Sequence, residues 1–122
     1  MTLNVIKNLL KVTKAALTDK IYMSTRISDV EELGWKRIEN EALSYKRAEL
    51  IKDMFNEPVL NPVIYNMEMP KEWTHKEYMR MWHYVLFIMR FRKCRMVAFQ
   101  EDLLGSKGCR EEVTLGLKTT IL

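Results

Sequence analysis

Apolar side chains recur at steps of three and four along most of the chain, and this spacing predicts helices. Residues 1–18 carry such a stripe together with three lysines and no acidic residue, which predicts a basic amphipathic helix. A second stripe over residues 38–55 predicts another helix. We expect it to end before Pro58, because proline cannot continue the helical hydrogen-bond ladder.

Two capping boxes, in which a hydroxyl and a glutamate each bond the other residue's backbone N–H, mark further helix starts. Ser28 and Glu31 form the first, and Thr74 and Glu77 form the second. The second opens the longest predicted helix, residues 75–104, which would measure about 45 Å at 1.5 Å per residue. Its first half is apolar nearly all round, so we expect several neighbours to bury it. The need for several neighbours indicates that the chain is a subunit of a larger assembly.

The predicted fold class is all-α: one small, irregular helical domain over residues 1–122, dependent on partners and with one long C-terminal helix. The 122 residues are enough for a single domain. Four Gly and three Pro are too few turn formers for a many-stranded sandwich or barrel. Residues 19–27 and 56–73 are expected to be connectors, and the tail after Leu104 is expected to dock on a surface.

Net charge and hydropathy exclude few classes of binding partner. The net charge of +4 suits an acidic protein face, anionic lipid or RNA, and it selects none of them. The most apolar stretch, residues 81–89, is far shorter than the roughly 20 residues of a membrane-spanning helix. Residues 1–18 are compatible with a mitochondrial targeting helix, a helix lying on a membrane, or an ordinary helix docked on the core.

No motif for catalysis or for a cofactor is present. His75 and His83 are too far apart to chelate one ion without further ligands, and Cys94 and Cys109 read as two reduced, inert thiols. Adjacent glutamates occur at 31–32 and at 111–112. Neighbours on a helix point about 100° apart, so neither pair is predicted to act as an acid–base couple, and both are expected to be solvated. We therefore expect no enzyme activity and no catalytic, cofactor-binding or metal-binding residue.

Contacts with partners are the remaining expectation from the residues themselves. Large aromatic side chains dominate protein interfaces, so the predicted partner-facing anchors are Trp73, Trp82 and Phe87. The predicted contacts to lipid headgroups or to an acidic loop are Arg90, Arg92 and Lys93. Nucleic acid is disfavoured, because acidic residues interleave with the basic ones rather than leaving one continuous basic face.

Four segments in the first two thirds of the chain resemble the subunit 7 family of the mitochondrial cytochrome bc1 complex. They are residues 19–22 (DKIY), 29–40, 45–48 (YKRA) and 70–74 (PKEWT). Their order and approximate spacing agree with the family pattern. The connector with Pro58 and Pro62, the apolar block at 81–89 and the tail after Leu104 depart from it.

The resemblance implies a non-catalytic accessory subunit of complex III, on the matrix side of the mitochondrial inner membrane. Such a subunit binds no cofactor, contacts cytochrome b and supports assembly of the electron-transfer complex. Three alternatives remain open. They are a subunit of another respiratory complex or of ATP synthase, a mitochondrial ribosomal or other RNA-binding protein, and a small enzyme or redox protein that uses Cys94.

Overall fold

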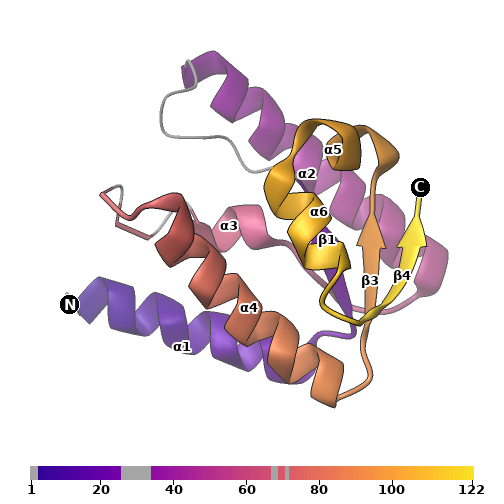
Figure 1. Ribbon diagram of the computed structural model, residues 1–122, viewed down its shortest axis with the longest axis horizontal. Coiled ribbons are helices and arrows are strands. Elements are labelled where there is room, and N and C mark those ends of the chain that lie inside the picture. Colours follow the sequence, from indigo (N-terminus) through magenta and orange to yellow (C-terminus); the bar gives the residue numbers. More distant parts are fainter. Residues whose placement is uncertain (1–2, 26–33, 67–68, 71) are drawn as a thin grey trace.

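The structure, a computed structural model, describes residues 3–25, 34–66, 69–70 and 72–122. Among these residues, one or two helices separate each strand from the next along the chain (Figure 1). In order they are α1 (Leu3–Thr18), β1 (Ile21–Ser24), α2 (Gly34–Phe55), β2 (Val59–Leu60), α3 (Pro62–Asn66), α4 (His75–Phe91), β3 (Arg95–Ala98), α5 (Gln100–Gly105), α6 (Lys107–Val113) and β4 (Lys118–Ile121).

The four strands form one parallel sheet in the order β2-β1-β3-β4, so the all-α prediction is wrong. Parallel strands need a crossover, usually a helix, whereas antiparallel strands are joined by tight turns. A parallel sheet therefore needs few Gly and Pro, and their scarcity does not exclude it. The protein is an α/β structure.

The predicted helix over residues 75–104 is also wrong, because α4 ends at Phe91. Arg92 caps it, and Lys93 takes a left-handed backbone conformation with φ of 61°. The backbone N–H of Cys94 donates to the carbonyl of Met89, which closes the helix end. The chain then enters β3, which pairs with β1 on one side and with β4 on the other. Residues 95–98 are therefore a central strand and not a helix.

Each segment expected to be a connector or a tail holds a strand. β1 lies within residues 19–27, β2 lies within residues 56–73, and β4 lies near the C-terminal end. Asn56, with φ of 52°, turns the chain after α2. The carbonyl of Pro58 then accepts hydrogen bonds from the N–H groups of Lys20 and Ile21, which joins the start of β2 to the start of β1.

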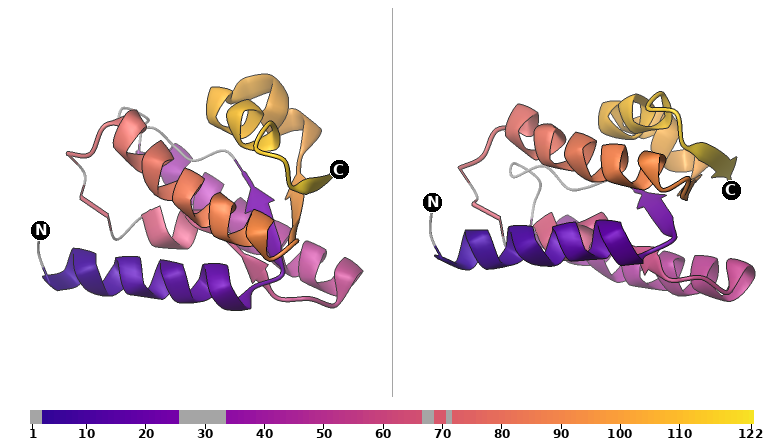
Figure 2. Two further views of the ribbon diagram at one scale, coloured as in Figure 1. Left: turned by 60° about the horizontal axis from the view of Figure 1, so that its bottom comes forward. Right: turned by 90° about the horizontal axis from the view of Figure 1, so that it is seen from below.

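Helices cover both faces of the sheet. On one face Tyr22, Leu60 and Met96 pack against apolar side chains of α1 and α4. On the other face Met23 and Val97 pack against α2 through Ile51. Figure 2 shows α4 and α2 on opposite sides of the strands. The result is three layers, with a core on each side of the sheet.

Some local predictions are confirmed. The Thr74–Glu77 capping box is present, with both reciprocal hydrogen bonds, and it opens α4. α2 ends at Phe55, before Pro58. The predicted Ser28–Glu31 capping box lies outside the described residues. Within the described part of the chain, no helix combines the length and the apolar character needed to cross a membrane.

Candidate functional site

The strand order places a topological switch point between β1 and β3. From β1 the chain passes outward to β2, and it then returns to the other side of β1 to build β3 and β4. In open parallel sheets, ligands bind in the crevice outside the carboxyl ends of the strands at such a point. α5 and α6 lie at the end toward which the strand arrows point (Figure 1). The side chains at this carboxyl edge are therefore the first place to look for chemistry.

A buried carboxyl, that of Glu112 on α6, is held at this edge by two hydroxyls of β1. Tyr22 Oη donates a hydrogen bond to Glu112 Oε2, and Ser24 Oγ donates to Glu112 Oε1 at 3.0 Å. Residues two apart on a strand point to the same face, so Tyr22 and Ser24 reach one carboxyl together. Glu112 is 5% exposed and Ser24 and Tyr22 are fully buried. The prediction that this glutamate is solvated is wrong.

Burial dominates the electrostatics of Glu112 and raises its pKa from 4.5 to about 7. The hydrogen bonds from Tyr22 and Ser24 favour the ionised form and oppose this rise, while the charge of Glu111 adds to it. Burial and the neighbouring carboxylate raise the pKa of Tyr22 well above 10, so its hydroxyl keeps its proton and remains a donor. A pKa of about 7 is in the range that suits an acid–base group at neutral pH.

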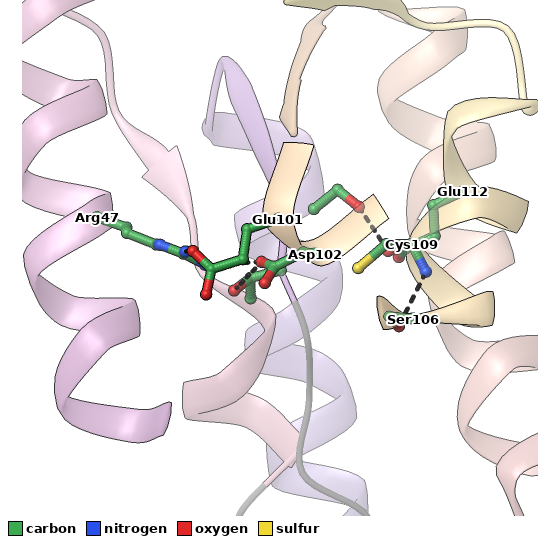
Figure 3. A network of polar contacts seen from close by, with 8 residues as sticks. Arg47, Glu101, Asp102, Ser106, Cys109 and Glu112 are labelled. Atoms are coloured by element: carbon green, nitrogen blue, oxygen red, sulfur yellow. Dashed lines mark hydrogen bonds and ion pairs between the residues drawn. The ribbon is translucent and has the colours of Figure 1, made fainter. Parts of the chain in front are cut away.

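A second buried carboxylate, Asp102 of α5, lies on the α2 side of the same edge. Arg47 Nη1 of α2 contacts Asp102 Oδ2 at 2.7 Å, and Thr25 Oγ1 donates to the same oxygen at 3.3 Å. The guanidinium of Arg47 also stacks over the ring of Phe99, 4.2 Å from its centroid. Figure 3 shows Arg47 reaching from its helix toward Glu101 and Asp102, with Glu112 on the far side of the group. The ion pair fixes α5 against α2.

Ser106 and Cys109 complete the labelled cluster in Figure 3. Ser106 is the N-cap of α6, and its hydroxyl accepts from the backbone N–H of Cys109 at 3.4 Å. Burial raises the pKa of the Cys109 thiol, so it stays protonated at neutral pH. Among the residues that the structure describes, no three His, Cys, Asp or Glu side chains are grouped to hold a metal ion. The chemistry of the edge rests on its carboxyls and hydroxyls.

Comparisons with protein-family models, curated proteins and solved structures give no match to this chain. The predicted membership of the cytochrome bc1 subunit 7 family is therefore not tested by any relative. The all-α class that accompanied the respiratory-complex assignment is contradicted by the parallel sheet. Residues 19–22, which carry part of the resemblance, include the first two residues of β1.

The three predicted aromatic anchors lie in different environments. Trp82 is 1% exposed, and its Nε1 donates to Asn66 Oδ1 at 2.8 Å, so its ring is part of the core of this chain. Trp73 is half-buried and packs edge-on against Tyr78, with centroids 5.5 Å apart. Phe87 is 68% exposed on the outer side of α4. Of the three, Phe87 presents most of its ring to the surroundings.

The three predicted basic contacts lie together at the C-terminal end of α4, beside the amino ends of the strands. Arg92 Nη1 donates to the carbonyls of Ala16 and Asp19, at 2.6 and 2.8 Å. These bonds supply donors to main-chain carbonyls at the C-terminal end of α1. Arg90 is exposed, and its guanidinium lies close to Gly116. These residues are at the opposite edge from Glu112, so they take no part in the carboxyl-edge site.

No local signal in the sequence connects the main members of the site, so they were not predicted as site residues. Tyr22 and Ser24 lie in a segment expected to be a connector. Arg47 lies in the YKRA segment of the family resemblance, which gives no sign of a buried ion pair. Glu112 looks like its neighbour Glu111, which forms an exposed i,i+4 pair with Lys107 at 3.9 Å. One usable signal was the pair of hydroxyl residues, Ser24 and Thr25, directly after the apolar run IYM.

Proposed function

We propose that this chain is a small-molecule enzyme domain that binds a neutral, hydroxyl-rich ligand of the nucleoside or glycoside class at the carboxyl edge of its sheet. In this proposal Glu112 is the acid that promotes cleavage or transfer at the glycosidic bond. The single observation that carries the proposal is the geometry of the buried Glu112 carboxyl, which Tyr22 and Ser24 hold at the topological switch point. Burial raises the pKa of this carboxyl to about 7, which agrees with an acid–base role.

The charge of the edge favours a ligand without phosphate. Glu112, Asp102 and Glu101 are acidic, and the guanidinium of Arg47 already contacts the last two. Carboxylates repel phosphate but accept hydrogen bonds from the hydroxyls of a sugar. Doubly wound parallel sheets bind nucleotide-like molecules at this place in the fold. A nucleoside, which combines a base with a ribose and carries no charge, satisfies both conditions.

A carboxyl that is about half protonated at pH 7 suits glycosidic chemistry. In the proposed step Glu112 gives its proton to the leaving nitrogen or oxygen as the bond from that atom to the anomeric carbon breaks. Water or another hydroxyl then adds to the anomeric carbon and releases a proton. The hydroxyls of Tyr22 and Ser24 remain as donors to the carboxylate and stabilise its charge after the transfer.

The test is turnover of a nucleoside panel, comprising uridine, inosine, adenosine and their 2′-deoxy forms, with release of free base followed by chromatography. We expect at least one substrate to turn over, with kcat falling as pH rises above about 7 because Glu112 loses its proton. Glu112→Gln should lower kcat by about 10²-fold or more, the usual contribution of a general acid.

The matched control is Glu111→Gln, which removes the same charge from the adjacent, more exposed position. It should leave kcat within about twofold of the native value. The proposal would be overturned if no nucleoside in the panel is turned over and none shows saturable binding. Equal losses in Glu112→Gln and Glu111→Gln would remove Glu112 from the assigned role.

A further inference from the structure

A pocket of about 440 Å³ lies between α1 and α3, outside the carboxyl-edge site. Lys11 and Lys14 line it from α1, Ile64 and Tyr65 line it from α3, and Asp19 joins them just beyond the end of α1. The left view of Figure 2 draws α3 beside α1, and Asn8 Nδ2 of α1 donates to the carbonyl of Tyr65 at 3.0 Å. The volume is in the usual range for small-molecule pockets.

The charged side chains of this pocket form no salt bridge and no hydrogen bond with the described residues, although the charge of Arg92 acts on the carboxyl of Asp19. Lys11, Lys14 and Asp19 take part in none of the salt bridges of the described chain, and none of the three side chains makes a hydrogen bond there. Arg92 bonds the main-chain carbonyl of Asp19 and not its carboxylate. Two exposed lysines and one half-buried aspartate therefore line a single pocket, and none of the three is in a salt bridge with a described residue.

The carboxyl of Asp19 lies near the charge of Arg92 but forms no salt bridge with it. The side chain is half-buried, and burial raises the pKa of its carboxyl, an effect that the nearby Arg92 charge only partly opposes. A bound cation would favour the ionised carboxylate. Lys14 and Lys11 precede Asp19 by five and eight positions, or about 7.5 and 12 Å along a helix at 1.5 Å per residue. The open charges are therefore spread along the pocket.

We propose that the α1–α3 pocket binds a small zwitterion whose ammonium pairs with Asp19 and whose carboxylate pairs with Lys11 and Lys14. An ω-amino acid, with its two charges at opposite ends of a methylene chain, is the simplest molecule of this class. Its methylene chain would lie against the apolar surface of Ala15 and Ile64, which also line the pocket. A ligand of one sign would leave either the acid or the lysines unpaired.

The experiment titrates the full chain with 4-aminobutyrate and 6-aminohexanoate, and with the single-charge analogues butyrate and butylamine, followed by amide chemical shifts in NMR. We expect a zwitterion to bind about tenfold more tightly than either analogue, with shifts confined to α1, α3 and residue 19. Asp19→Asn should reduce this preference for the zwitterion to about twofold or less, and Lys11→Met with Lys14→Met should abolish saturable binding of the zwitterions.

Two matched controls remove a charge elsewhere. Lys7→Met acts on an exposed lysine of α1 that does not line the pocket, and Asp53→Asn acts on an exposed carboxylate of α2. Both should leave the affinities unchanged. The proposal is overturned if butyrate binds as well as 4-aminobutyrate, if Asp19→Asn keeps the preference, or if no probe shifts the α1 and α3 amides at tens of millimolar. The pocket shares no residue with the Glu112 site, so failure here leaves the nucleoside assay unaffected.

Discussion

The hydroxyl of Tyr22 on β1 donates a hydrogen bond to Oε2 of Glu112 on α6, and the two residues lie 90 positions apart in the sequence. Together with the bond from Ser24, this contact connects the centre of the sheet to a helix at its carboxyl edge. It fixes where the acidic proton of the proposed site is held. Removing this hydrogen bond is also the most direct way to change the pKa of Glu112.

Tyr22→Phe should raise the pKa of Glu112 above about 7, because the lost hydrogen bond favours the ionised carboxyl. The variant keeps the ring and removes only the oxygen, so the core packing is preserved. The pKa can be followed from the side-chain carboxyl resonance of Glu112, assigned by its loss in Glu112→Gln. Tyr84→Phe, on the exposed side of α4, is the control and should leave the titration unchanged. An unshifted titration in Tyr22→Phe would contradict the role of this bond.

Stability should fall as pH rises between 4.5 and about 7 because of Glu112. Its pKa is raised in the folded protein, so the folded state binds more protons than the unfolded state in this window. The contribution is fully present below the unfolded pKa, and its loss through about pH 7 is on the order of 3 kcal/mol. Urea denaturation at a series of pH values measures it. Subtracting the profile of Glu112→Gln isolates this residue from other titrating groups, and identical profiles would refute the assignment.

Arg47→Met should destabilise the protein by about 3 kcal/mol or more, because it removes the ion-pair partner of the buried Asp102 carboxylate. The side chains of Arg47 and Asp102 are 11% and 8% exposed, so water replaces the lost partner poorly. Lys107→Met breaks a surface pair and should cost less than about 1 kcal/mol. Guanidinium denaturation gives both values. Equal costs for the two variants would show that Asp102 does not depend on its buried partner.

Arg92→Met should cost about 1.5–3 kcal/mol, since two carbonyls at the end of α1 lose a charged donor. Arg80→Met changes an exposed arginine of α4 and should stay within about 0.5 kcal/mol of the native protein. Thermal denaturation at one pH compares them. If Arg92→Met is as stable as Arg80→Met, the bonds to Ala16 and Asp19 contribute little to the free energy of unfolding. That result would favour the prediction that Arg92 contacts a partner.

Trp82→Ala should destabilise the protein by about 3–5 kcal/mol, because it opens a cavity in the core and leaves Asn66 without its indole donor. Phe87→Ala removes an exposed ring from the same helix and should change the free energy of unfolding by less than about 0.5 kcal/mol. Chemical denaturation of the isolated chain separates the two. A small effect at Trp82 would mean that the ring is not part of the core in solution.

The local signals of the sequence determined several helix boundaries. The Thr74–Glu77 box opens α4 where expected, because its two hydrogen bonds involve neighbouring residues only. The end of α2 before Pro58 likewise follows from the geometry of proline. Such features need no tertiary context, so the sequence by itself is sufficient to predict them.

The strands and the site were decided by the tertiary structure. All four residues of β1 are buried, so they show no alternation of apolar and polar side chains, and β2 has only two residues. α4 ends at Phe91, although neither Gly nor Pro follows directly, because β3 gains its hydrogen bonds from β1 and β4. Glu112 differs from Glu111 only in the burial that the fold imposes on it. The pairing of strands and the desolvation of a carboxyl are long-range effects, and local sequence does not record them.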